Sequence, residues 1–412
     1  MNTKIIIIIG LLFPIAAFSQ SQPLSMEQAV QVALQQNKGL KSADASVAYY
    51  RGLTRTSGEL PKTQVGLQYG QNNSYANDNN FSVSQSIPFP TLFGAKKQLN
   101  EAQVESAVWQ KATTQNDLIY QVKQTYIQLL YLRELRTLLT RQDSLFTSFE
   151  RTADLRYRTG ESRMLEKTAA TGRLQEVRNL LRQNQADEKI YMARLQSLLG
   201  STESVDITGT DIPETVFQAP QDSVAISDNP QLHYLRQQVT IADRQKKVYS
   251  AAILPDITVG YFNQTLIGMA LNASGSPLAT GSNRFQGFQV GVALPLWLGP
   301  MKARVKAEEK QQQAASLAFD NSQLVLQNQY RQAVQQFVKF RSSLDYYHAT
   351  ALPNADLLLQ QATKSYTSGD IGYAEYFLNL EQVLNVRQGY LQARNDIKQA
   401  ELYIAYLSGR QR

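Results

Sequence analysis

Few residues of this sequence have the types and spacing that catalysis or metal binding requires. The chain holds two histidines and no cysteine, which excludes a cysteine nucleophile, a thiolate-ligated metal, a disulfide framework and a lipid-modified N-terminal cysteine. His233 and His348 lie far apart, and only His348 has an acid, Asp345, one helical turn away. The sequence contains no nucleophile–base pair and no phosphate-binding loop. We therefore expect neither an enzyme nor a resident metal or cofactor.

The residues that recur with a fixed spacing are turn residues. Tyr157-Arg-Thr-Gly160 returns as Tyr366-Thr-Ser-Gly369, and the glycine that follows Leu199 returns after Ser408 at the same offset. Glycine permits the positive φ that a tight turn between helices often requires. The matched turns predict an internal duplication of two largely helical halves.

Two pairs of alternating segments precede these turns. They cover about residues 63–70 and 81–88 in the first half, and about 256–264 and 285–295 in the second. Apolar side chains alternate with polar or small ones, which is typical of strands with one apolar and one polar face. Gln85 is the one polar residue on an apolar face.

The alternation has two interpretations. Two isolated hairpins packed on helices would produce it, but lone hairpins are marginal in water. The other interpretation is a share of a transmembrane barrel, whose strands place apolar residues outward and polar residues inward. Four strands are too few, since the smallest such barrels have about eight, so this interpretation requires an oligomer. Aromatic residues that flank the strands would then form a membrane-interface girdle: Tyr69, Phe89, Phe93, Tyr261, Phe262 and Trp297.

The N-terminus has the features of a secretory signal peptide over residues 1–19. Lys4 precedes an apolar run, and Ala17-Phe18-Ser19 supplies the small residues that signal peptidase requires, so the mature chain would start at Gln20. The run is too short for a transmembrane anchor. The net charge of +7 is spread among interspersed acids, which indicates solvated helix faces and no nucleic-acid surface.

Helices are predicted for most of the remaining chain. The first repeat, residues 20–200, would hold a helix over about 26–59 that breaks near Asn37, a long helix over about 93–157 and a return helix over about 165–199. An equatorial linker would follow at 201–230. The second repeat, residues 231–412, would hold a long helix over about 301–366, kinked by Pro353, and a return helix over about 373–407. Roughly 65 residues at 1.5 Å each make the first long helix about 100 Å long.

With these elements in order, the chain resembles the TolC family of outer-membrane efflux proteins over essentially its whole mature length. The resemblance rests on the duplicated helix–strand–strand–helix–helix plan, on the strand-to-helix bends Pro88–Gly94 and Pro295–Pro300, and on the turns at Gly160 and Gly369. It implies a mainly α protein whose homotrimer forms a twelve-stranded membrane β-barrel on a long α-helical barrel. Such a protein lies in the outer membrane of a Gram-negative bacterium and extends into the periplasm.

The resemblance also implies a function and partners. Ser82–Gly94 and Leu155–Glu161 look most like outer-membrane components of heavy-metal resistance pumps. The implied role is a passive exit duct, with metal cations as the exported substrate. Its partners would be a periplasmic adaptor (membrane fusion) protein, an inner-membrane RND-type pump and outer-membrane lipid. A drug-efflux or type I protein-secretion conduit is the alternative within this class, and a structural coiled-coil stalk or adhesin is the alternative outside it.

Two groups of site residues follow from the resemblance. The tip turns would dock the adaptor through Tyr157, Thr159, Gly160, Glu161, Ser368, Gly369 and Asp370. The periplasmic gate would comprise Tyr366, Tyr373, Glu375 and Tyr376. In the family, a tyrosine, an arginine and two acids form a latch there, but Ile371 and Leu378 stand at the arginine and second acid positions. Aromatic packing would then replace ionic closure. Plain turns and an ordinary exposed Glu375 are the alternatives.

Overall fold

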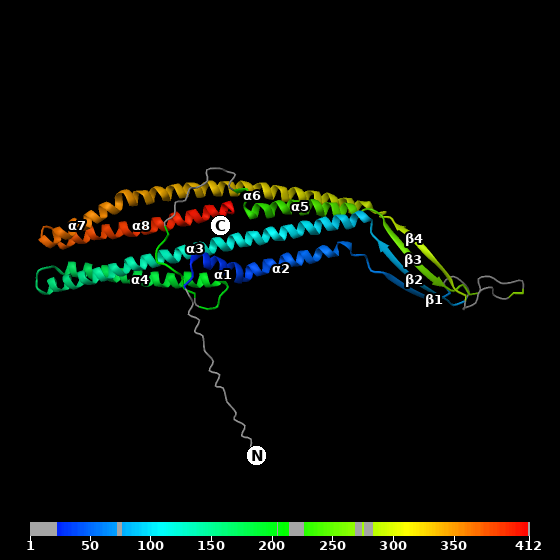
Figure 1. Cartoon of the computed structure of the whole chain (residues 1–412), viewed down its shortest axis with the longest axis horizontal. Coiled ribbons are helices and arrows are strands. Elements are labelled where there is room, and N and C mark those ends of the chain that lie inside the picture. Colours follow the sequence, from blue (N-terminus) through cyan, green and yellow to red (C-terminus); the bar gives the residue numbers. More distant parts are fainter. Residues whose placement is uncertain are drawn as a thin grey trace, which may run out of the picture. The chain divides into compact units, whose positions relative to one another are not determined.

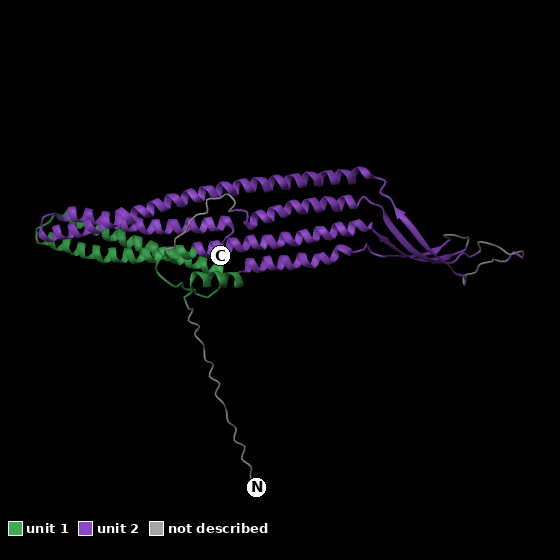
Figure 2. Cartoon of the chain, turned by 45° about the horizontal axis from the view of Figure 1, so that its top comes forward, with its two compact units in different colours: residues 1–36, 125–213 green, residues 37–124, 214–412 purple. Residues whose placement is uncertain are grey.

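The computed structural model describes residues 23–71, 76–203, 205–213, 226–267, 274–275 and 283–410. The predicted signal peptide therefore lies outside the described residues, as do parts of the 201–230 linker and of the loop between the last two strands. The chain divides into two compact units, residues 1–36 with 125–213 and residues 37–124 with 214–412 (Figure 2). These units differ from the sequence repeats, whose bounds stay a prediction.

The second unit contains one four-stranded antiparallel sheet in the order β1-β2-β3-β4 (Figure 1). Its strands are β1 (Gln64–Gly70), β2 (Asp78–Ile87), β3 (Asp256–Gln264) and β4 (Phe285–Ala293). The two hairpins are thus not isolated, because β2 pairs with β3 over eight residues. β1 and β4 are the two edges of the sheet.

The register gives this sheet one apolar face. Val65, Val83, Tyr261 and Phe288 form a row across all four strands, and Phe288 is 84% exposed. The adjacent row on the other face holds polar or small residues: Gln64, Ser84, Gly260 and Gln289. Exposed apolar side chains on one face are what a lipid-facing strand requires.

Two details of the sheet refine the sequence analysis. The expected girdle position of Phe262 was wrong, because this residue pairs with Ser82 and Gly287 on the polar face. Gly287 makes room for the Phe262 ring, since a Cβ there would lie 2.9 Å from it. The polar exception Gln85 is satisfied locally: it accepts from the Thr63 hydroxyl at 2.6 Å and donates to the Pro61 carbonyl at 2.8 Å.

The helices of the second unit pack along one another. They are α2 (Lys38–Leu53), α5 (Pro230–Ala251), α6 (Leu298–Tyr346), α7 (Leu352–Ser368) and α8 (Tyr373–Ser408), joined by residues 90–124 of α3 (Pro90–Arg158). A buried cluster that includes Leu232, Phe337 and Ile404 joins α5, α6 and α8. α5 begins where α8 ends, and the Asn229 amide donates to the Leu407 carbonyl at 2.9 Å.

The two long helices differ as predicted. α3 runs without interruption for 69 residues and begins at Pro90, where a proline costs no hydrogen bond. In the second repeat, a π-helical turn over Tyr347–Ala351 separates α6 from α7. Pro353 stands just beyond this turn and cannot donate to the carbonyl four residues earlier, so the ladder loosens there. Tyr347 packs on Gly389 of α8, where a Cβ would lie 2.2 Å from the tyrosine oxygen.

The first unit comprises α1 (Met26–Gln36), residues 125–158 of α3, α4 (Met164–Leu199) and the segment 205–213. Ser25 and Gln28 form a capping box, with the Ser25 N–H donating to Oε1 of Gln28 at 2.8 Å. α1 ends at Gln36, which confirms the break predicted near Asn37. None of the described helices has both the length and the apolarity needed to cross a membrane.

Candidate functional site

The turn between α3 and α4 is built on Gly160, as predicted. Its φ is +79°, and the Glu161 and Gly160 N–H groups donate back to the carbonyls of Arg156 and Tyr157 at 2.9 and 3.1 Å. This is the Schellman pattern, which satisfies the last carbonyls of a helix. Open space surrounds the position where a Gly160 Cβ would stand, so only the backbone requires glycine there.

The turn between α7 and α8 repeats this geometry. Gly369 has φ +81°, and Asp370 N–H donates to the Ser365 carbonyl at 2.8 Å. Ser368 adds a hydroxyl bond of 2.6 Å to the Asp370 carboxylate. The expected duplication of the turn is thus present in its backbone geometry, and the exposed Gly160, Glu161, Ser368 and Asp370 are accessible in the described chain.

Ion pairs stiffen the α3–α4 end. The Asp154 carboxylate contacts Lys167 at 2.7 Å and Arg158 at 2.8 Å. The hydrogen bond from Lys167 lowers the pKa of Asp154 below its usual value. The Lys167 ammonium also lies 5.4 Å from the centre of the Tyr157 ring, and Thr159 donates to the Leu155 carbonyl at 3.2 Å. The predicted tip residues of this turn therefore share one local network.

The predicted gate tyrosines lie within the α7–α8 hairpin. Tyr366 and Tyr376 stack with centroids 4.6 Å apart and ring planes 7° apart, and the Tyr376 hydroxyl lies 3.3 Å from that of Thr363. Tyr373 is 5% exposed and stacks on Phe377. These three tyrosines therefore belong to the packing of their own hairpin.

Glu375 has no recorded contact with this aromatic cluster among the described residues. Its side chain is exposed, and it makes no ion pair with another described residue. Leu378, at the second acid position of the family latch, is 65% exposed. Any closure through Glu375 must therefore involve a group outside the described chain.

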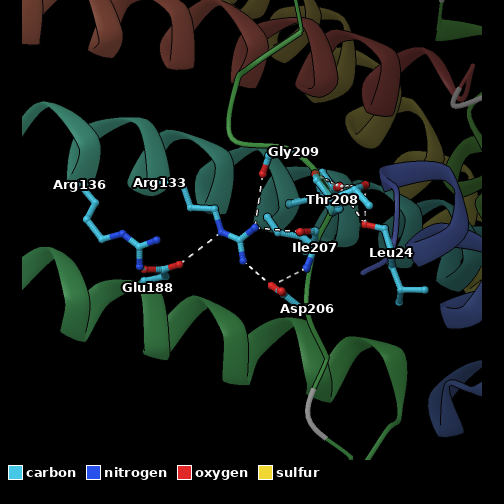
Figure 3. A network of polar contacts seen from close by, with 9 residues as sticks. Leu24, Arg133, Arg136, Glu188, Asp206, Ile207, Thr208 and Gly209 are labelled. Carbon is cyan, nitrogen blue, oxygen red and sulfur yellow. Dashed lines mark hydrogen bonds and ion pairs between the residues drawn. The ribbon is translucent and has the colours of Figure 1, made fainter. Parts of the chain in front are cut away.

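The sequence analysis missed a polar cluster in the first unit, which we call the N-terminal clip (Figure 3). Arg133 of α3 donates to Glu188 of α4 at 3.3 Å and to the Ile207 carbonyl at 2.8 Å, and it also pairs with Asp206. Arg136 reaches the other oxygen of Glu188 at 2.8 Å. One guanidinium thus joins two helices and the 206–209 segment.

The clip also holds the chain before α1. Leu24 donates its N–H to Asp206 and accepts from Thr208, both at 2.9 Å. The Tyr126 hydroxyl lies 2.9 Å from the Leu24 carbonyl and 2.8 Å from that of Thr208. Burial raises the pKa of Tyr126 above its usual value. Burial opposes ionisation of Asp206, but bonds from Arg133 and the Ile207 N–H outweigh it and lower the pKa of Asp206.

Both histidines lie against aromatic side chains. His233 stacks on Trp109 at 4.2 Å, and Nε2 of His348 lies 3.4 Å from the Tyr390 hydroxyl. Within the described ranges, no group of three or more histidine, aspartate and glutamate side chains is placed to hold a metal ion.

Comparison with solved structures shows the fold of outer-membrane channels over nearly the whole chain. CusC aligns with a TM-score of 0.76 and 16% identity, covering 95% of both chains. The outer-membrane channel OprN gives 0.79 and 16%, covering 94% of this chain and 91% of its own. The CmeC outer-membrane channel of Campylobacter jejuni gives 0.74 and 15%, covering 94% and 86%. This fold confirms the predicted class, a mainly α protomer with a barrel-forming sheet.

Sequence comparison finds one family model that matches part of the chain. No curated protein matches the chain. The family model described as outer membrane efflux protein matches residues 223–410, which comprise α5 to α8 with β3 and β4. The description of this family agrees with the predicted location in the outer membrane and with the predicted role in efflux. Over these residues, the chain is similar to the outer membrane efflux protein family, in agreement with its resemblance to the TolC family.

Proposed function

We propose that the chain is the outer-membrane exit duct of a tripartite efflux system. It would conduct substrate passively, after an inner-membrane RND-type pump and a periplasmic adaptor deliver it. The observation that carries the proposal is a sheet with one exposed apolar face, joined at one end to helices as long as the 69 residues of α3. That arrangement suits a conduit with a membrane part and a long stem.

The proposed assembly is a homotrimer. The edge strands β1 and β4 present unpaired backbone groups, and in lipid each unsatisfied group costs several kcal/mol. Three copies would supply twelve strands and pair each β1 with a β4 of a neighbour. Apolar side chains on α6 support the same arrangement, because Leu317, Leu324 and Val338 are 61%, 57% and 54% exposed at heptad-like spacing. These side chains would be buried against an adjacent copy.

The proposed docking surface for the adaptor is the pair of glycine turns. Both turns are exposed, both have fixed Schellman geometry, and both recur at one offset in the sequence. The proposed gate is the α7–α8 hairpin, where the Tyr366–Tyr376 stack holds the helix ends together. Glu375 would contribute through contact with a neighbouring copy.

The proposal also includes the class of substrate that is exported. The segments Ser82–Gly94 and Leu155–Glu161 favour metal cations, with drugs or secreted proteins as the alternatives. A duct does not need to bind its cargo, so the lack of a metal-binding group among the described residues does not weigh against metal export.

A deletion strain of the native host tests the duct and its cargo together. We expect the deletion to lower tolerance of divalent or monovalent metal cations, and the restored gene to recover it. Loss of drug tolerance with normal metal tolerance would favour the drug conduit. Extraction of the membranes with carbonate addresses the stalk alternative, because an inserted barrel stays in the membrane pellet and a peripheral stalk does not.

A further inference from the structure

All four connections between the sheet and the helices leave from the same end of the sheet (Figure 1). This follows from the antiparallel order, in which the start of β1, the end of β2, the start of β3 and the end of β4 are neighbours. Taken together with the first residues of α3, β3 and α6, the connecting segments are residues 54–63, 88–98, 252–257 and 294–307. They all belong to the second unit and lie around this end of the sheet.

Each connection presents an exposed apolar side chain. Leu60 is 46% exposed, Phe89 36% and Leu254 39%, whereas Leu296 and Trp297 after β4 are 79% and 84% exposed. They follow directly on the exposed apolar residues Ile257 and Val292, which pair with each other at this end of the sheet. The apolar surface therefore extends to the first turn of the helices.

The same four segments also carry basic residues close to these apolar side chains. The four segments carry seven basic residues against two acids, Glu59 and Asp256. We call the seven the basic collar: Arg55, Lys62, Lys96, Lys97, Lys302, Arg304 and Lys306. All are exposed except Lys96, which is half-buried. Both long helices contribute, with no acid in the first turn of either.

Contacts among the described residues do not account for most of this charge. Arg304 donates to the Tyr249 hydroxyl at 2.5 Å and lies over its ring, and Lys97 lies 3.9 Å from Glu101. Lys302 and Lys306 make no ion pair with any residue that the structure describes. They stand four residues apart near the start of α6, where two like charges repel each other. An external anion would remove this conflict.

We propose that the basic collar binds the headgroups of anionic phospholipids, with the acyl chains on the adjoining apolar surface. A phospholipid fits this surface because exposed apolar groups lie next to cationic groups, as is typical of proteins at the interface between acyl chains and headgroups. The inference rests on the proposed function for its orientation, which puts the helix-proximal end of the barrel at the inner leaflet. A soluble anion would use the charges but not the exposed Leu296 and Trp297.

Native mass spectrometry of the whole protein in detergent tests the collar. The probes are phosphatidylglycerol and phosphatidylcholine with identical acyl chains. The collar variant is Lys302→Gln with Lys306→Gln. The matched control is Lys310→Gln with Lys339→Gln, which removes the same charge from the same helix at two other exposed positions.

We expect wild type and control to retain phosphatidylglycerol in preference to phosphatidylcholine. Each lysine near an anionic headgroup contributes about fivefold in binding, so the collar variant should retain phosphatidylglycerol about thirtyfold less. Its retention of phosphatidylcholine should not change. Equal retention of phosphatidylglycerol by all three proteins would overturn the proposal. So would its full displacement by soluble glycerol phosphate, because the site would then bind an anion alone.

Oligomeric state and channel conductance distinguish a failure of the lipid proposal from a failure of the proposed duct function. If the collar variant fails to oligomerise while the control assembles, the lysines pair with a neighbouring copy and the lipid assignment is wrong. If the variant assembles and conducts normally in phosphatidylcholine bilayers but has lost the lipid preference, both proposals stand. A wild-type protein that forms neither oligomer nor channel would contradict the duct, irrespective of any lipid retained.

Discussion

At the residue scale, two glycines three positions apart allow the effect of backbone strain to be tested without steric crowding. Gly369 has φ +81°, whereas Gly372 has φ −80°, and neither has a heavy atom within 4 Å of a built Cβ. Gly369→Val should therefore cost about 1–3 kcal/mol in the turn, while Gly372→Val should be tolerated. Because the turn belongs to the proposed docking surface, efflux should fail in the Gly369→Val strain at normal protein levels. Full efflux activity there would remove the docking assignment.

Arg133 and Arg136 form a second matched pair, since both bind Glu188. Arg133 is 14% exposed and also bonds the Ile207 carbonyl and Asp206, whereas Arg136 is 46% exposed with one carboxylate partner. Arg133→Ala should cost about 2–3 kcal/mol because it leaves charged and backbone groups unpaired. Arg136→Ala should cost less than about 1 kcal/mol. Thermal unfolding in detergent checks the order, and equal melting temperatures would contradict the central role of Arg133.

Acid should loosen the N-terminal clip. The pKa of Asp206 lies below its usual 3.8 in the folded chain, so its ionised form stabilises the fold above that pH. This stabilisation disappears as the pH falls from about 3.8 through the lower folded value. Limited proteolysis with an acid-stable protease should cut residues 205–213 faster at pH 3 than at pH 5. The Asp206→Asn variant should show a smaller difference between the two pH values.

At the element scale, the contact between the π-helical turn and α8 predicts that a glycine-to-alanine change in α8 is destabilising. Glycine to alanine in a helix normally gains about 1 kcal/mol, as expected for Gly172→Ala, where the Cβ meets open space. At Gly389 a Cβ would lie 2.2 Å from the Tyr347 oxygen, so Gly389→Ala should lower the melting temperature. Tyr347→Leu in the same chain should recover part of the loss. A Gly389→Ala protein as stable as wild type would contradict the contact.

The sheet faces predict opposite responses to charge at neighbouring positions. Val290 is 73% exposed on the apolar face and pairs with Val259, whereas Gln289 pairs with Gly260 on the polar face. Val290→Arg should cost about 2–4 kcal/mol at the bilayer midplane and reduce the amount of assembled protein. Gln289→Arg should assemble normally. The same yield for both variants would contradict the assigned faces.

The sequence predicts the strands and the helix turns, but not the contacts between segments that are distant in the chain. Alternation located the strands, and the glycines located both turns, because each of these features depends on local backbone geometry. The face of Phe262 could not be read from residue type, since its place depends on pairing with Gly287. The clip left no periodic signal, because Arg133 binds backbone carbonyls of a distant segment. Pro353 predicted a kink in the long helix, but not the π-helical turn that separates α6 from α7.

At the scale of the whole molecule, the proposed trimer depends on the two edge strands of the sheet, β1 and β4. The natural chain has no cysteine, so introduced pairs report only on the contacts under test. One cysteine at Leu67 on β1 should be combined in turn with one at Gln286, Phe288, Val290 or Val292 on β4. We expect at least one combination to form disulfides between copies and to give species of one, two and three chains on a denaturing gel.

The pair Val83→Cys with Tyr261→Cys serves as the control, because these residues are directly opposed on β2 and β3 of one chain. It should cross-link within a single copy and migrate as a monomer. A β1–β4 series that stops at three chains fits a barrel of twelve strands, whereas a longer ladder would indicate an open assembly. If every β1–β4 combination cross-links within one copy, the four strands close on themselves. The trimer would then be wrong, and the proposed exit duct would lose the barrel it requires.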